Sequence, residues 1–588
     1  MGALLVVVGA VVVAVPGSGL LGPSDAQSTP TGVHRLPPAF IASANDTIDA
    51  AIERSAWTQY HDYSTVRIGR IERPALLVTN REQWVRQVQV PADGARYEAI
   101  VGAIDGPATV RVGRLGSDLV FRTRAAEGEW TRVTLGLDAG NGATQSVTVD
   151  VDVPPGSVAA WGPELVTPTR REDQQPDVIL ISLDTVRRDH LTPYAPPLPT
   201  TPALAAFARE ALRFDQAIST SSWTVASHAT LFTGHFPADS LGYQSRVEPG
   251  AYTLPEIFAA NGYRTFGVSG GPYTDPRWGL HQGFDEYVVS GHRENARDAT
   301  ARAIEWMSKA GPAPRFVFLN YFDAHEPLEL SEEVRFATGV TQDVPSAEWS
   351  ELDMGRRRIT PAVRQRLQRA YGAELRAIDD ELHRLFEYLR GEGRWERTLV
   401  IAWADHGQLL GERGYLGHAY TLNEELIRIP LIIKAPAGSR LPLGVYKSPI
   451  QNDDLFALTQ TLGGLANPEG EKIAAAIAAN GSIRRLTFAK IHHEPLPALL
   501  THPRWRSATQ WAVRDGVTKI VRDLEGRVRA YDIRGPEERP ISVPGSDSPL
   551  LAALDRFRSW SARAPSVPTL GPLSPAEVER LRSLGYIR

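Results

Sequence analysis

Two apolar runs that each end abruptly in charged residues constrain the fold of this chain more than any other feature of its sequence. Residues 177–183 read DVILISL and precede Asp184, and residues 398–404 read TLVIAWA and precede Asp405 and His406. Continuous apolar runs are typical of strands buried on both faces of a sheet. Functional side chains of such sheets gather at the carboxyl ends of the strands. We therefore expect these polar residues to form one site together with the segment STSSWTVASHATLFTG (Ser219–Gly234).

The sequence between residues 177 and 455 alternates strand patterns with helix patterns. Further strand-like segments are YRTFGVSG, RFVFLNYF and RIPLIIK, and helix-like segments are TPALAAFAREAL and ATARAIEWMSKA. A long helix is expected from about residue 361 to 390, with apolar residues at helical spacing at Leu367, Tyr371, Leu375, Ile378, Leu382, Leu385 and Leu389. This alternation predicts an α/β fold, with a mixed or parallel β-sheet covered by helices on both faces. Residues 456–588 contain short strands that predict a small C-terminal antiparallel subdomain.

Residues 45–168 have a different pattern. Short segments of alternating apolar and polar residues, broken by Gly, Asp and Pro, predict an antiparallel β-sandwich. The polar residues 169–176 are expected to link this sandwich to the domain that follows. The sandwich contains no catalytic cluster, and both a passive stabilising role and glycan or cell-wall binding are open.

The first residues of the chain are strongly apolar. Ala3 to Val15 is an uninterrupted apolar run of thirteen residues, followed by Pro16 and Gly17. Such a run is too short to span a bilayer and matches the core of a signal peptide, although the usual preceding basic residues are missing. We interpret residues 1–30 as a signal peptide or N-terminal membrane anchor and expect a periplasmic, extracellular or outward-facing anchored protein. The alternatives are a mis-called start codon and a short buried strand.

Composition excludes several functional classes. The formal net charge is -5 and the chain has no cysteine. A nucleic-acid partner is therefore not expected, because phosphate neutralisation requires clustered Lys and Arg. The lack of cysteine excludes disulfides, zinc thiolate sites and a Cys nucleophile.

The residue types at the two strand ends suit a metal site. Asp184, Asp405 and His406 offer hard oxygen ligands and one imidazole, which bind Mg²⁺, Ca²⁺, Mn²⁺ or Zn²⁺. Thr224 begins an apolar helical run, where a hydroxyl beside a metal loses its proton more readily. The alternative is that Thr224 only caps this helix.

From about residue 177 to the C-terminus, the order of these clusters resembles the order of motifs in the sulfatase family of the alkaline phosphatase superfamily. The family signature has a Cys or Ser nucleophile, then x-Pro-x-Arg, and ends in Thr-Gly ten residues after the nucleophile. Counting back from Gly234 places Thr224 at the nucleophile position. Further matching segments are SLDTVRRDHL, GYRTFGVSG, HQGFDEY, NYFDAHEPL, ADHGQLLGERGYLGHAYTLNEELIRIPLIIK, WAVRDGVTKIVRD, YDIRGPEE and LRSLGYIR. The resemblance implies an alkaline-phosphatase-like fold for residues 177–455, with residues 456–588 as its C-terminal subdomain.

The resemblance also implies roles for individual residues. Asp184, Asp405 and His406 would bind one divalent metal ion, Ca²⁺, Mn²⁺ or Mg²⁺ with Zn²⁺ also open, and Thr224 would occupy its open coordination position. Three histidines would complete the site. His325 would contact the transferred group or protonate the leaving group, His418 stands where many sulfatases place a substrate-binding Lys, and His228 replaces the signature Arg.

Departures from the signature indicate which kind of ester the chain would cleave. Sulfatases convert the Cys or Ser to formylglycine, and Thr is not a known substrate for that conversion. The signature Pro is also replaced, by Ala226. Threonine nucleophiles occur in related phosphodiesterases and phosphotransferases of the superfamily. We therefore expect an exported metal-dependent ester hydrolase or transferase that acts through Thr224 on phosphate mono- or diesters.

Two alternatives remain: a sulfuric ester hydrolase that works without formylglycine, and a catalytically silent surface-binding protein. The expected substrate is an ester of a small molecule, a lipid headgroup or a glycan. Association with a membrane or cell wall would fit an exported protein.

Overall fold

The structure is a computed structural model of the chain. It describes most residues between 64 and 561, and its larger gaps are 90–94, 115–120, 138–143, 169–174, 237–246, 248–252, 289–294 and 492–508. Shorter gaps of four residues or fewer also occur. The proposed signal segment, most of the predicted linker 169–176 and the C-terminal LRSLGYIR lie outside the described residues. No helix within the described part is long and apolar enough to cross a membrane.

The chain divides into two compact units, one of which contains the described residues before 173 together with 259–262 and 285–288. One sheet of this unit has the order β10 (Leu165–Pro168), β4 (Ala95–Asp105), β9 (Val158–Trp161) and β2 (Ile71–Val78). Strands β1 (Ser64–Ile68) and β15 (Glu286–Val288) pair with β2, and β7 (Trp130–Leu137) pairs with β4. The second sheet has the order β3 (Glu82–Gln89), β8 (Thr144–Asp152), β5 (Ala108–Arg114) and β6 (Phe121–Ala125).

All the strand pairs of this unit are antiparallel, and alternate residues of both sheets point into one core. Tyr97 and Val133 come from the first sheet and Val110 and Val149 from the second, and all four are fully buried. Period-two burial from both sides is the arrangement of a β-sandwich. The predicted sandwich is therefore confirmed as part of the fold, and β9 and β10 are strands that the sequence pattern did not reveal.

The second unit contains a mixed sheet with the order β14, β16, β11, β17, β21, β12 and β22. Its four neighbouring parallel strands are β14 (Arg264–Val268), β16 (Arg315–Tyr321), β11 (Asp177–Leu183) and β17 (Thr398–Trp403). Strand β21 (Leu431–Lys434) runs antiparallel to β17, followed by β12 (Leu212–Phe214) and β22 (Gly444–Tyr446). Every residue of β11, β16 and β17 is buried, which is why these strands read as continuous apolar runs.

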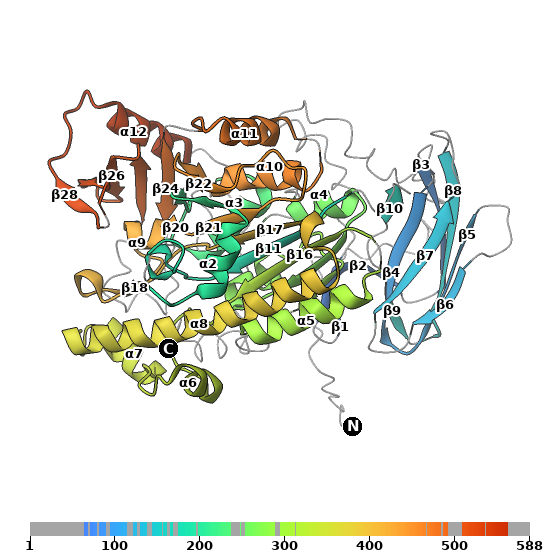
Figure 1. The fold of residues 1–588 in the computed structure, drawn as a ribbon. Helices are drawn as coiled ribbons and strands as arrows, with labels where there is room; N and C mark the ends of the chain where they lie inside the picture. The colour runs from blue at the N-terminus through green and yellow to red at the C-terminus, as the bar shows by residue number, and fades with distance from the viewer. Residues whose placement is uncertain are drawn as a thin grey trace, which may run out of the picture. The chain divides into compact units, whose positions relative to one another are not determined.

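Helices cover both faces of this mixed sheet (Figure 1). Helices α5 (Ala296–Lys309) and α8 (Pro361–Gly391) pack together on one face. Helices α3 (Thr224–Thr233), α10 (Asn452–Leu462) and α11 (Pro468–Ala478) lie on the other. The predicted α/β fold with a mixed sheet between helical layers is confirmed.

A smaller antiparallel sheet follows toward the C-terminus. It has the order β24 (Thr487–Ile491), β25 (Gln510–Arg514), β26 (Thr518–Asp523), β27 (Val528–Asp532) and β28 (Arg539–Ile541). Helix α12 (Pro549–Ser561) packs on it through Leu554 and Phe557, which meet Trp511 and Val513. This is the small C-terminal antiparallel subdomain expected from the sequence. The exact residue limits assigned to the domains, such as 168 and 455, stay predictions.

Candidate active site

The register of β11 and β17 brings the two predicted acidic ligands to the same edge of the sheet. Ser182 pairs with Trp403, and Asp184 and Asp405 each follow two residues later, just beyond the ends of the two strands. Both carboxylates and the His406 side chain are fully buried. Candidate ligand atoms of Asp184, Asp405 and His406 all lie within 4.8 Å of one another. The structure therefore brings together the three residues that the sequence proposed as metal ligands.

Backbone groups hold one oxygen of Asp405 and leave the other facing the centre of the cluster. The Thr185 and His406 backbone N–H groups donate to Asp405 Oδ1 at 3.2 and 2.8 Å. Asp405 Oδ2 is buried without a hydrogen-bond partner among the described residues and lies 3.3 Å from His406 Nε2. A buried carboxylate oxygen left in this way is costly unless a cation completes its environment.

The protonation states of these groups suit metal binding. Burial lowers the pKa of His406 to about 4, against the opposing charge of Asp405. Its Nδ1 lies 3.0 Å from the Gly407 carbonyl oxygen, so Nδ1–H donates there and Nε2 presents its lone pair to the cluster. Burial acts to raise the pKa of Asp405, but His406 and His228 hold it below its ordinary value. A neutral imidazole and an ionised carboxylate are the forms that coordinate metals.

Thr224 lies beside this cluster. It is the first residue of α3, is 2% exposed, and its Oγ1 lies 3.2 Å from His406 Nε2. The N-cap position belongs to Trp223 instead, so the alternative that Thr224 is only the helix cap is not supported. Because α3 begins at this residue, its unpaired N-terminal N–H groups lie near the hydroxyl and favour an anionic group there.

His228 lies one helical turn further along α3 and is fully buried. Its Nδ1 contacts the Thr224 carbonyl oxygen at 2.8 Å, and its Nε2 contacts Ser182 Oγ at 2.9 Å. Its Nδ1 also lies 3.7 Å from Asp405 Oδ2. His228 therefore connects Thr224, Ser182 on β11 and Asp405, and both of its ring nitrogens are engaged within the protein. That His228 orients residue 224 stays a prediction.

His325 and His418 extend the site on its other side. The His418 ring stacks on His406 with centroids 4.4 Å apart, and the His325 ring meets His418 edge-on at 4.9 Å. Glu326, which the sequence analysis did not select, lies between them, with Oε1 3.3 Å from His418 Nδ1. The available signal was the carboxylate directly after His325 in the segment DAHEP. The structure thus brings all the predicted site residues into one cluster.

Three further residues that the sequence analysis did not assign to the site lie near the strand tips, and two of them, Asn320 and Tyr371, make hydrogen bonds there. Asn320 on β16 donates from Nδ2 to Asp184 Oδ2 at 3.3 Å. The Tyr371 hydroxyl on α8 accepts from the Arg187 backbone N–H and donates to the Thr185 carbonyl oxygen, both at 2.8 Å. Gln408 is fully buried, and neither atom of its amide has a hydrogen-bond partner among the described residues.

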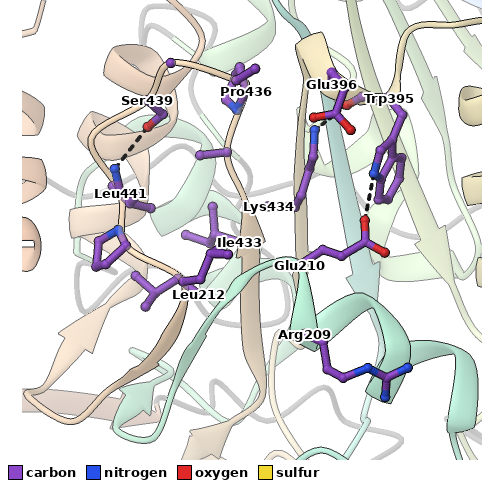
Figure 2. Close-up of a pocket in the computed structure, with 15 residues that line it drawn as sticks. Arg209, Glu210, Leu212, Trp395, Glu396, Ile433, Lys434, Pro436, Ser439 and Leu441 are labelled. Atoms are coloured by element: carbon purple, nitrogen blue, oxygen red, sulfur yellow. Dashed lines mark hydrogen bonds between the residues drawn. The ribbon is translucent and has the colours of Figure 1, made fainter.

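A cavity of about 380 Å³ lies at the opposite edge of the sheet. Its lining includes Trp395 and Glu396, just before β17 begins, and Lys434, at the end of antiparallel β21 (Figure 2). Lys434 Nζ donates to the Trp395 and Thr398 carbonyl oxygens, and Trp395 Nε1 donates to Glu210 Oε2 at 2.9 Å. These charged groups are engaged in structural contacts and do not include any of the residues clustered around Thr224.

The chain is similar to several known proteins. The Sulfatase family model matches residues 176–465. The uncharacterized sulfatase YidJ of Escherichia coli is 22% identical over 390 residues, which are 56% of this chain and 77% of that protein. The N-acetylglucosamine-6-O-sulfatase of Bacteroides thetaiotaomicron is 23% identical over 391 residues, covering 50% of this chain and 68% of the relative.

Among solved structures, the phosphonate monoester hydrolase from Silicibacter pomeroyi superposes with a TM-score of 0.52 and 18% identity. The match covers 66% of this chain and 95% of that one. At this level of identity the likeness shows a shared fold and leaves the reaction to the residues of the site.

Proposed function

Residues 176–465 belong to the sulfatase family of the alkaline phosphatase superfamily, and on this premise we propose that the protein is an exported enzyme that cleaves phosphate diesters through Thr224. The family consists of hydrolases that generally bind a divalent metal. The observation that carries the proposal is the placement of Thr224 Oγ1, 3.2 Å from His406 Nε2 and beside the buried acids Asp184 and Asp405.

The choice of phosphate over sulfate esters rests on the side chain at position 224. Oxidising the CH₂ of a Cys or Ser gives an aldehyde, whereas the β-carbon of threonine already carries a methyl group. The same oxidation of Thr224 would give a ketone and not the formylglycine aldehyde. An unmodified hydroxyl can instead attack the phosphorus of a diester and expel one of its two alcohols, which leaves the other alcohol and Thr224 joined to the same phosphate. Water then displaces Thr224 in line to release a phosphate monoester, or an acceptor alcohol does so to release a new diester.

The residues around Thr224 supply the other requirements of this reaction. Asp184, Asp405 and His406 would hold the metal, which when bound lowers the pKa of the hydroxyl and neutralises charge on the non-bridging oxygens. His228 fixes the backbone carbonyl of Thr224 and with it the start of α3. The first turn of α3 favours the anionic phosphoryl group. His325 and His418, whose rings follow on from His406, would face the leaving group.

The ester itself would be that of a small molecule, a lipid headgroup or a glycan. Export rests on the apolar run from Ala3 to Val15, which lies outside the described residues. Association with a membrane or cell wall remains part of this proposal, as does the outward location.

Substitution of the nucleophile tests the proposal directly. We expect Thr224→Ala to lower turnover of an aryl phosphate diester by roughly 10³-fold or more while the metal content is unchanged. Thr224→Ser keeps a hydroxyl and should retain most of the activity. The exposed Thr341→Ala is the matched control and should leave turnover unchanged. Mass spectrometry of acid-quenched enzyme should find phosphate that still carries the retained alcohol of the diester on Thr224 during turnover; an active Thr224→Ala enzyme would refute the mechanism.

A sulfuric ester hydrolase is the competing function, because the family match alone favours it. Equal amounts of metal-loaded enzyme should be assayed with an aryl sulfate and an aryl phosphate diester. We expect the phosphate diester to have the larger kcat/KM. A larger kcat/KM for the sulfate, with residue 224 unmodified by mass, would establish a sulfatase that works without formylglycine.

A further inference from the structure

A second cluster of potential metal ligands adjoins the first. Candidate ligand atoms of His325, Glu326 and His418 lie within 4.8 Å of one another. His418 is 4% exposed, and the His325 and Glu326 side chains are 0% and 16% exposed. Two imidazoles and a carboxylate are a ligand set of catalytic zinc sites, which keep a fourth position open. None of these residues belongs to the set formed by Asp184, Asp405 and His406.

Two residues of the cluster, His418 and Glu326, have buried polar atoms without a hydrogen-bond partner among the described residues. His418 is buried, yet neither of its ring nitrogens makes a hydrogen bond of normal geometry with a described residue, although Nδ1 lies 3.3 Å from Glu326 Oε1. Glu326 Oε2 is also buried without a hydrogen-bond partner among the described residues. Buried polar atoms left in this way call for a bound ion or water.

The backbone sets the tautomer of His325. Its Nδ1 lies 2.7 Å from the Glu326 carbonyl oxygen, so Nδ1–H donates to this oxygen and Nε2 presents a lone pair. A backbone carbonyl that accepts from the far nitrogen is the usual support for a metal-binding histidine. The 3.3 Å between His418 Nδ1 and Glu326 Oε1 is close to the edge of a tetrahedron with metal–ligand bonds of about 2.0–2.1 Å.

We propose that His325, Glu326 and His418 bind a second divalent cation of the Zn²⁺ type, so that the active site holds two metal ions. The stacked rings of His406 and His418, with centroids 4.4 Å apart, place the two ligand sets next to each other. Residue 418, which stands at the position of a substrate-binding Lys in many sulfatases, thus becomes a metal ligand in this chain.

Charge balance supports two ions. Among the described residues no Lys or Arg pairs with Asp405 or Glu326, and the groups that lower their pKa values are histidines. The nearby Arg187 is occupied by ion pairs to Asp189 and Glu412. One divalent ion would be neutralised by Asp184 and Asp405. An anionic ester therefore needs a further positive charge, which a second ion between two neutral imidazoles and one carboxylate would provide.

A second ion would also change the role of His325. An imidazole whose Nε2 is coordinated cannot donate a proton to the leaving group. Stabilisation of the departing oxygen would then fall to the second ion, as in enzymes with paired metals. This role rests on the proposed phosphodiester cleavage, whereas binding of the ion does not.

Metal stoichiometry tests the second site. Protein stripped with a chelator is titrated with Zn²⁺ by calorimetry, and bound metal is counted after gel filtration by mass spectrometry. We expect two equivalents for the native protein and for the exposed control His383→Ala. Glu326→Gln and His418→Ala should each bind one equivalent, and so should Asp184→Asn, which removes the other site. Combining Glu326→Gln with Asp184→Asn should leave none.

Titration with Co²⁺ adds a readout that is independent of activity. The site of His325, Glu326 and His418 should give the visible absorption of four-coordinate Co²⁺, and Glu326→Gln should abolish it. One equivalent in the native protein, or two in Glu326→Gln, would overturn the proposal. Two equivalents without turnover of any phosphate diester would refute the proposed reaction and leave the second site standing, so the two failures are distinguishable.

Discussion

At the scale of single residues, the chain departs from the sulfatase signature at Thr224 and at His228, and a contact between these two residues links the departures. Thr224 carries its own hydroxyl, and His228 bonds the Thr224 backbone carbonyl oxygen. The His228 ring is enclosed edge-on by Trp403 and Phe318, with centroids at 4.9 and 5.8 Å. An arginine at this position would have to displace these rings. The histidine therefore connects the start of α3 to β11.

The first prediction concerns His228→Ala. It leaves Ser182 Oγ and the Thr224 carbonyl oxygen without their buried partner, so we expect a loss of about 2–4 kcal/mol in the free energy of unfolding. Removing this support beside Asp405 should also weaken metal affinity by roughly 10–100-fold. Urea unfolding and metal titration measure the two effects. His228→Gln, which can restore one hydrogen bond, should recover part of both, and unchanged metal affinity in His228→Ala would exclude the positioning role.

At the scale of secondary-structure elements, the sequence predicts the scaffold better than the contacts made through it. The apolar spacing of α8 placed Tyr371 on the buried face of the helix, and it is fully buried. Spacing could not show that its hydroxyl bridges Thr185 and Arg187, because that contact joins residues 184 or more positions apart. Thr185 has a positive φ of 58°, which is uncommon outside glycine. The long helix thus holds the turn that follows Asp184.

Tyr371→Phe tests this connection between α8 and the proposed metal site. The substitution removes two buried hydrogen bonds but keeps the ring, so we expect about 1–3 kcal/mol less stability and weaker metal binding. Tyr388→Phe on the same helix is the control, because the Tyr388 hydroxyl has no hydrogen-bond partner among the described residues. Chemical unfolding and metal titration of both variants provide the comparison. Equal metal affinity in the two variants would show that the turn does not depend on α8.

At the scale of the whole molecule, both the sheet that carries the site and the strand ends that form it were predictable. Continuous apolar runs identify buried strands, and the polar residues after them identify the site. The cluster of His325, Glu326 and His418 was predictable only in part. Both histidines were expected at the site, but Glu326 was not selected, because its contact with His418 joins residues that are distant in the sequence. The attachment of the C-terminal sheet was also hidden, since Arg514 Nη2 on β25 pairs with the buried Glu424 at 2.8 Å across ninety positions. The periodicity of apolar residues predicts local structure, but it does not predict ion pairs between residues that are distant in the sequence.

Global stability should depend on pH through Glu256, a buried carboxyl in the first turn of α4 (Leu254–Ala260). Its Oε2 accepts from the Thr253 backbone N–H at 2.8 Å, but its Oε1 has no hydrogen-bond partner among the described residues. Burial raises the pKa of Glu256 to about 8 from the ordinary 4.5, despite the hydrogen bonds from Thr253. The folded protein thus keeps this proton at pH values where the unfolded chain has released it.

The sign of the effect follows from this proton balance. Below pH 4.5 both states are protonated, and between pH 4.5 and 8 the unfolded state gains free energy by ionising, so the contribution of Glu256 to stability falls as pH rises. Glu256→Gln removes this fall. Its unfolding free energy relative to the native protein should therefore rise from pH 5 to pH 8, by at most about 1.4 kcal/mol per pH unit. Urea unfolding across this range measures the difference. The exposed Glu471→Gln should show no such slope, and a flat difference for Glu256→Gln would mean that Glu256 is ionised in the folded protein.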